Sequence, residues 1–295
     1  MMIGKIEFKR RRDFGQVIND TFTFVRQNFK PLLKTYFTFC GLFVLASMSS
    51  MLVYQYKMIN IINTGSKGIS RQYIGFSNIY GIEYFLSLLF SLATYASMTV
   101  AILSYIALYV KKGNQIPTIE EVWGYFKYYF FRIFGSSILL ILMVGVGLIF
   151  CLVPGLYLFP FVAMMFPIMV IENGTFGYSF SRSFQMIKDN FWVTFGTLII
   201  VWIIAYACMS MVALPTTLFS MIGLFTSKNP QLSLPFSMAT IVLQSLCQVF
   251  TIIPIITISL SYFNLLEQKE NVGLMERIND FGSVEKPIDT RPEEY

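Results

Sequence analysis

Residues 133–171 read IFGSSILLILMVGVGLIFCLVPGLYLFPFVAMMFPIMVI and contain no Asp, Glu, Lys or Arg. A helix crosses the hydrocarbon core of a bilayer with about 20 apolar residues, so this run is long enough to cross twice. Pro154 and Gly155 near its middle suit a tight reversal, because proline fixes φ and glycine tolerates turn conformations. The run therefore predicts a hairpin of two membrane helices, at about 133–153 and 156–171.

The second helix of this hairpin is the shorter one. At a rise of about 1.5 Å per residue it would reach only about 24 Å, and it carries Pro160 and Pro167. The alternative is a re-entrant hairpin, which enters the bilayer and leaves on the same side. Both versions return the chain to the side from which it came.

The composition of the whole chain is that of a membrane protein. Of 295 residues, 55% are hydrophobic and 13% are charged, whereas soluble domains have about 25% charged residues. Residues 1–266 would form a single membrane domain, and residues 267–295 a cytoplasmic tail, partly disordered, whose helix breaks near Asn271. We expect an all-α integral membrane protein with six transmembrane helices, at about 35–56, 84–110, 133–153, 156–171, 191–225 and 236–266.

The basic residues are unequally divided between the two sides of these spans. Of the 22, 18 lie in the N-terminal arm, in 111–132, in 172–190 and in the tail, and the other side holds only Lys57, Lys67, Arg71 and Lys228. Because basic residues accumulate on the cytoplasmic side, both termini are predicted to be cytoplasmic. A polar segment separates the cluster KRRR from the first apolar run, so no cleaved secretory signal is expected.

One amphipathic pattern occurs twice, each time directly before an apolar run. Residues 14–29 read FGQVINDTFTFVRQNF, and residues 176–191 read FGYSFSRSFQMIKDNF. Both place large apolar side chains on one helical stripe, which predicts amphipathic helices at 14–29 and 176–190. On the cytoplasmic side such helices lie in the headgroup plane, with their aromatic face in the membrane and their cations toward anionic lipid. The candidate membrane-surface residues are Phe14, Phe22, Arg26, Phe29, Phe176, Phe184, Lys188 and Phe191.

A third segment, 118–132, occupies the same position before the third predicted span. Thr118 and Glu121 form a capping box there, and apolar residues follow at helical spacing. We therefore expect three units in series, each a cytoplasmic interfacial helix followed by a transmembrane hairpin. The alternative is that any Phe-rich helix beside a membrane has this pattern. Against it, the matches between the first two copies also include Gly15 with Gly177 and Asn28 with Asn190.

Three segments carry a family resemblance: RDFGQVINDTFTFVRQNFKPLL (12–33), VPG (153–155) and SFSRSFQMIKDNFWVTFGTLI (179–199). They resemble a broad group of bacterial inner-membrane proteins that includes the membrane domain of some glycerophosphoryl diester phosphodiesterases and the YciC-like proteins. The resemblance implies a multi-pass protein of the bacterial inner membrane. In those phosphodiesterases a separate soluble domain with His and metal-binding carboxylates carries the chemistry, so a membrane platform without that activity is implied here.

Catalytic machinery is not expected in this chain. The absence of His excludes His-containing zinc sites and Ser-His-Asp triads. Glu120 and Glu121 form an acidic pair, but Tyr125 stands where a di-glutamate membrane protease needs Arg, so we interpret the pair as first-turn acids of a helix. No predicted span has a carboxylate, Lys or Arg near its centre, which disfavours ion-coupled transport. We expect no catalytic residue, no metal, no cofactor and no nucleic-acid partner.

One polar stripe lies in the last predicted span. Gln244, Gln248 and Thr251 share a face of 236–266, where Pro254 is expected to kink the helix. Such a stripe either lines a polar pathway or bonds to neighbouring helices. We expect a non-enzymatic accessory or scaffold protein in envelope or lipid homeostasis, with membrane lipids, chiefly anionic, as partners. The alternative is a transporter or channel for an uncharged or amphipathic solute, and the sequence specifies neither a protein partner nor an oligomeric state.

Overall fold

The computed structural model describes residues 6–66, 80–150, 152–226, 234–271, 275 and 278. Within these residues the chain is helical and has no strand, so the predicted all-α fold is confirmed. The elements in chain order, where η marks a 3₁₀ helix, are α1 (Phe14–Gln27), α2 (Phe29–Ser66), α4 (Ile82–Lys111), α5 (Ile119–Phe150), α6 (Leu152–Ile171), α7 (Phe176–Ile187), η2 (Lys188–Asn190), α8 (Phe191–Thr226), α9 (Leu234–Cys247), η4 (Gln248–Thr251) and α10 (Ile252–Glu270).

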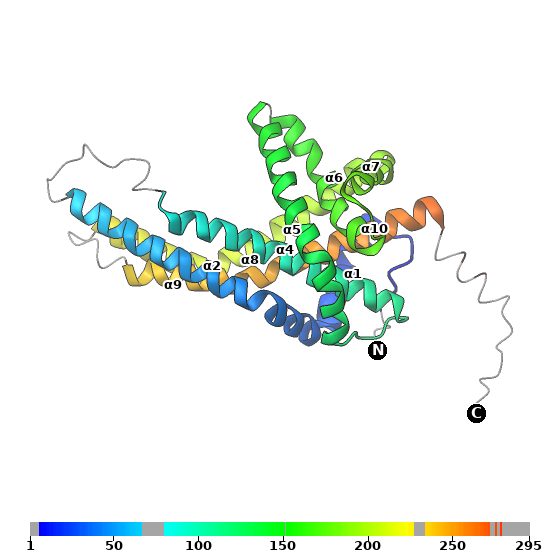
Figure 1. Cartoon of the computed structure of the whole chain (residues 1–295), viewed down its shortest axis with the longest axis horizontal. Helices are drawn as coiled ribbons and strands as arrows, with labels where there is room; N and C mark the ends of the chain where they lie inside the picture. Colours follow the sequence, from blue (N-terminus) through cyan, green and yellow to red (C-terminus); the bar gives the residue numbers. More distant parts are fainter. Residues whose placement is uncertain are drawn as a thin grey trace, which may run out of the picture.

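Several helical segments have the length and the apolar composition of membrane spans, as expected of a multi-pass membrane protein. Figure 1 shows α2, α4, α8 and α9 running along the long axis of the molecule. The described segment 155–171 of α6 is apolar but shorter, so a sixth span is not confirmed. The five segments of spanning length are 29–61, 82–111, 119–147, 176–219 and 235–270.

The α5–α6 hairpin takes another direction and rises steeply from that long axis (Figure 1). The predicted reversal at Pro154 and Gly155 is wrong, because both residues already lie in the first turn of α6. A proline is tolerated there, since the first N–H groups of a helix have no intrahelical acceptor. One glycine from each helix allows a close approach instead: a Cβ built on Gly147 of α5 would lie 3.6 Å from the Gly155 Cα of α6.

The start of α5 corrects the prediction of a separate interfacial helix at 118–132. Ile119–Phe150 is one continuous helix, so the third amphipathic segment and the apolar segment after it are not divided. The predicted capping box is present, since the Thr118 N–H donates to Glu121 Oε2 (2.8 Å) and the Glu121 N–H to Thr118 Oγ1 (3.4 Å). No proline interrupts the helix, and ring contacts of 5.2 and 6.0 Å run through the junction, along Phe126, Phe130 and Phe134.

The predicted span 236–266 is interrupted. α9 ends at Cys247, η4 follows, and α10 begins at Ile252. Pro254 accounts for this position, because it has no N–H for the carbonyl of Phe250 and its ring crowds that carbonyl. The expected disturbance by Pro254 therefore takes the form of a short 3₁₀ segment in the preceding turn.

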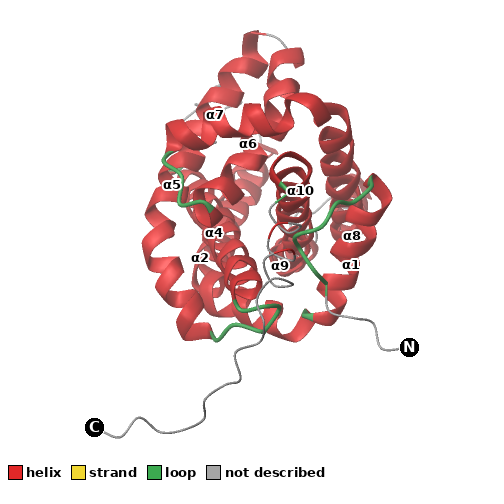
Figure 2. Cartoon of the chain, turned by 90° about the vertical axis from the view of Figure 1, so that its right-hand side faces the viewer, coloured by secondary structure: helices red, strands yellow, loops and turns green. Residues whose placement is uncertain are grey.

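α4 and α10 form the centre of the molecule. Small side chains of α4, among them Ala93, Ser97 and Ala101, are buried, and the Ser97 hydroxyl donates to the Phe39 carbonyl of α2 at 2.9 Å. Such small residues allow membrane helices to pack closely. Figure 2 shows α10 near the middle of the surrounding helices, where it contacts α1, α4, α6 and α8.

The end of α10 agrees with the predicted break of the tail. Asn271 adopts the left-handed conformation with φ of 50°, and its N–H donates to the Glu267 carbonyl at 3.2 Å. A left-handed residue at this position commonly ends a helix. Most of the predicted tail beyond Asn271 lies outside the described residues.

Candidate functional site at the amphipathic-helix end

The two copies of the repeated pattern form the short helices α1 and α7. Each follows a capping residue in extended conformation, Asp13 for α1 and Thr175 for α7. The same face of the helix is buried in both copies, which is what a repeated structural unit predicts. The corresponding buried pairs are Val17 and Ser179, Thr21 and Ser183, and Phe24 and Met186.

α1 has two unlike faces. Its buried face lies on α10, where the hydroxyls of Thr21 and Thr257 are 3.2 Å apart. Phe14 and Phe22 are each 38% exposed and Phe29 is 54% exposed. Arg26 is exposed near them. Phe22 and Phe29 of the predicted aromatic stripe therefore face outward, whereas Phe14 also lies beside α8, with its ring 3.8 Å from a Cβ built on Gly196.

The aromatic stripe of α7 is arranged differently. The Phe184 ring stacks on Phe161 of α6 with centroids 4.0 Å apart, and the Phe191 ring lies 5.7 Å from the same residue. Phe176 is also partly buried against the core, whereas Lys188 is exposed. The second copy thus packs its stripe against α6, whereas within the described residues the first copy lies chiefly on α10 and α8.

The Asn at the end of each copy joins the short helix to a neighbouring helix. Asn28 Oδ1 accepts from the Tyr105 hydroxyl of α4 at 3.1 Å. Asn190 Nδ2 donates to Gln268 Oε1 of α10 at 2.8 Å. These bonds hold the junctions at which the chain passes from α1 to α2 and from α7 to α8.

The N-terminal arm before α1 packs against the bundle, a contact that no pattern in the sequence predicted. Phe8 is 1% exposed, and its ring lies 5.1 Å from Phe24 of α1 and 5.4 Å from Phe263 of α10. The edge-to-face geometry of these rings is a favourable one. The arm thereby fixes α1 at the end of the bundle.

Arg12 of this arm is a buried cation. Its Nε donates to Asp20 Oδ2 at 2.8 Å, and one guanidinium nitrogen donates to the Phe8 carbonyl at 2.7 Å. Burial lowers the pKa of Arg12, and Asp20 only partly offsets this effect. One feature of the sequence indicates this buried cation. Asp20 lies on the same helical face as Val17, and a buried carboxylate needs a partner of opposite charge.

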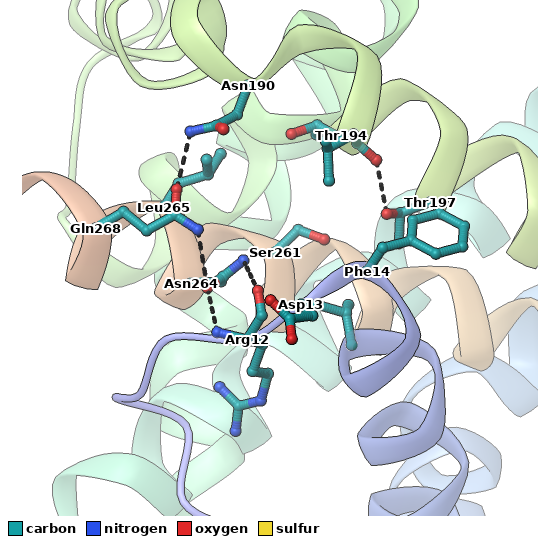
Figure 3. A pocket seen from close by; sticks show the side chains of 12 residues that line it. Arg12, Asp13, Phe14, Asn190, Thr194, Thr197, Ser261, Asn264, Leu265 and Gln268 are labelled. Atoms are coloured by element: carbon teal, nitrogen blue, oxygen red, sulfur yellow. Dashed lines mark hydrogen bonds between the residues drawn. The ribbon is translucent and has the colours of Figure 1, made fainter.

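A polar pocket lies between the start of α1, the start of α8 and α10 (Figure 3); we name it the α1–α8–α10 pocket. Its volume is about 260 Å³. Amides form one wall: Gln268 Nε2 donates to Asn264 Oδ1 at 3.4 Å, and Asn264 exchanges bonds of 2.7 and 3.1 Å with the backbone of Arg12. The pocket combines residues from both ends of the sequence.

Two hydroxyls in this pocket remain available. Thr194 and Ser261 line it, and neither side chain bonds to another residue in the described part of the chain. The Thr197 hydroxyl, by contrast, donates to the Val193 carbonyl at 2.7 Å. With the exposed carboxylate of Asp13, the pocket suits a small hydroxyl-bearing or amine-bearing group.

The predicted polar stripe is divided between different environments. Gln244 on α9 is exposed, whereas Gln248 in η4 is partly buried and its Oε1 has no hydrogen-bond partner in the described structure. The Thr251 hydroxyl donates to the Gln248 carbonyl at 2.5 Å. A 3₁₀ segment turns by about 120° per residue, so it rotates later residues off the predicted face. A polar pathway through these residues stays a prediction.

No family model matches this chain, and neither a curated protein nor a solved structure is found to be similar to it. The resemblance to the membrane domain of the phosphodiesterases therefore stays a prediction.

Proposed function

We propose that this chain is a non-enzymatic, multi-pass protein of the bacterial inner membrane that serves as an accessory or scaffold in envelope or lipid homeostasis. Both termini lie on the cytoplasmic side, and the partners of α1 are membrane lipids, chiefly anionic ones. One observation carries this proposal: α1 is held on α10 by its buried face, while Phe22 of α1 and Phe29 in the first turn of α2 are exposed.

The position of α1 supports a contact with the membrane surface. Its place is fixed by the Thr21–Thr257 contact, so its aromatic face has a defined direction. An exposed Phe stripe with a cation such as Arg26 beside it is the composition of an interfacial helix. Each basic residue close to an anionic surface adds roughly 1 kcal/mol of attraction.

The alternative function is a transporter or channel for an uncharged or amphipathic solute. The observation in its favour is the α1–α8–α10 pocket, with its available hydroxyls at Thr194 and Ser261. Against it, neither Gln244 nor Gln248 lines this pocket, so the predicted pathway does not reach it. We therefore prefer the scaffold, in which the pocket holds a headgroup.

The experiment compares wild type with Phe22→Asp in nanodiscs, with and without anionic lipid, by hydrogen exchange of the α1 amides. We expect anionic lipid to slow hydrogen exchange in α1 of the wild type and to have little effect in the variant. The reason is that the charged Asp side chain at position 22 disfavours burial of this face of α1 in the membrane. Exchange in α7 is the internal control, since its stripe packs on α6. Identical exchange in α1 with both lipids would reject the surface contact.

The cellular role is tested in a strain that lacks the gene. We expect a changed phospholipid composition or detergent sensitivity, restored by the wild type and not by Phe22→Asp at equal expression. Solute flux in proteoliposomes that depends on Thr194 and Ser261, with a normal envelope in the deletion strain, would favour the transporter instead.

A further inference from the structure

A groove lies between the first turns of α2 and the connection that leads into α5. Its volume is about 630 Å³. Lys30 and Lys34 of α2 form one side, and Thr118 and Glu120 lie at the start of α5 on the other. We name it the α2–α5 groove. It is separate from the α1–α8–α10 pocket, since the two share no lining residue.

The two lysines give the groove a local positive charge. Lys30 and Lys34 are both exposed and stand one helical turn apart, where like charges repel. Neither forms an ion pair with another residue in the part of the chain that the structure describes. Lys112, by comparison, pairs with Glu121 at 2.5 Å. An anion between Lys30 and Lys34 would relieve their repulsion.

The polar groups beneath the lysines point to an anion with several oxygens. Thr35 is only 3% exposed and lines the groove, yet its hydroxyl bonds to no residue within the described ranges. The N–H groups of Ile119 and Glu120 belong to the first turn of α5 and have no intrahelical acceptor. Such N–H groups bind phosphate oxygens well.

The walls of the groove are apolar. Pro31, Ile116 and Ile119 contribute to its lining, beside the ring of Tyr105. A free inorganic anion gains nothing from such walls, whereas an amphiphile can place its glycerol and upper acyl carbons on them. The groove thus combines a cationic rim with an apolar wall at the end of the bundle where α1 lies.

We propose that the α2–α5 groove binds the phosphodiester group of an anionic phospholipid, with Lys30 and Lys34 as its cations and the Thr35 hydroxyl as a hydrogen-bond donor. The inference rests on the proposed function, because it gives the lipid-associated scaffold a specific lipid site. The groove contains none of the aromatic residues of α1. A negative result for the groove would therefore leave the proposed membrane contact of α1 standing, and the reverse also holds.

Glu120 is the one carboxylate in the lining of the groove. It is exposed, so its charge is largely hydrated and can turn to solvent. It nevertheless lowers the local positive potential. Glu120→Gln is therefore expected to tighten binding of an anionic lipid, whereas a site for an ammonium group would be weakened by the same change.

The test measures binding to the purified full-length protein in detergent by native mass spectrometry. The probes are dioctanoyl phosphatidylglycerol, dioctanoylglycerol, which has the same acyl chains without phosphate, and inorganic phosphate. The variants are Lys30→Gln/Lys34→Gln and the isosteric Thr35→Val. The matched control, Lys111→Gln/Lys127→Gln, removes the same charge from exposed residues outside the groove.

We expect phosphatidylglycerol to bind the wild type and dioctanoylglycerol to bind far more weakly. The lysine double variant should lose about tenfold or more in affinity, Thr35→Val a few-fold, and the control less than about threefold. Equal losses in both double variants would mean diffuse charge attraction and would overturn the site. Inorganic phosphate that displaces the lipid at similar concentrations would overturn the lipid assignment, and so would weaker lipid binding by Glu120→Gln.

Discussion

Asp20 forms ion pairs with two arginines at the same distance, but the two arginine side chains differ in solvent exposure. Arg10 and Arg12 each place a guanidinium nitrogen 2.8 Å from Asp20 Oδ2. The Arg10 side chain is 45% exposed and that of Arg12 is fully buried. A buried ion pair is not stabilising in itself, but the loss of one partner leaves the other charge without compensation.

Asp20→Asn is therefore expected to lower the free energy of unfolding by about 3–5 kcal/mol, because it leaves Arg12 buried without its carboxylate. Arg10→Gln, which breaks only the exposed pair, should cost less than about 1 kcal/mol. Both values are measured by denaturant unfolding in the same detergent. Similar losses in the two variants would contradict the burial of Arg12.

At the scale of the element, α1 and α7 have the same pattern and opposite surroundings. The buried face is common to both, so the pattern itself positions each helix. The cover of the Phe stripe depends on the neighbouring helices, since α7 packs on α6 whereas α1 packs chiefly on α10 and α8. The sequence predicted the stripe in both copies, but it could not predict which copy is covered, because the α5–α6 hairpin decides that.

This difference predicts unequal effects for two equivalent substitutions. Phe184→Ala removes the stack on Phe161 and should destabilise the protein in detergent by about 1.5–3 kcal/mol. Phe22→Ala at the corresponding position of α1 should change the stability in detergent by no more than about 0.5 kcal/mol. Thermal unfolding of the two variants under one condition makes the comparison, and a larger loss for Phe22→Ala would refute the assigned faces.

The α5–α6 hairpin depends on a close approach of its helices. A Cβ at Gly147 would meet the Gly155 Cα at an ordinary contact distance of 3.6 Å, so Gly147→Ala should fold normally. Gly147→Leu should cost about 1–3 kcal/mol, because its larger side chain has to separate the helices. Unfolding curves of both variants test this; equal stability of the Leu and Ala variants would argue against the contact.

At the scale of the whole molecule, local sequence patterns predicted the helices better than the connections between them. Hydrophobic runs located α4 and α8 to within a few residues. The turn at Pro154 and Gly155 was misplaced, since a proline in the first turn of a helix leaves the same signal as one in a loop. The candidate sites were not predictable, because the α1–α8–α10 pocket joins Arg12 to Asn264, which no local pattern connects.

The membrane topology underlies every role proposed for α1 and for the α2–α5 groove. The topology can be tested with single cysteines introduced at Ser66, Gln115 and Ser283 in a protein without the four native cysteines. Position 283 lies outside the described residues. Ser66 ends α2, and Gln115 lies between α4 and α5. An impermeant maleimide added to intact spheroplasts should label position 66 and reach positions 115 and 283 only after permeabilisation. Labelling of position 115 or 283 as readily as position 66 in intact spheroplasts would contradict the cytoplasmic placement of both termini and of the helices that carry the proposed lipid contacts.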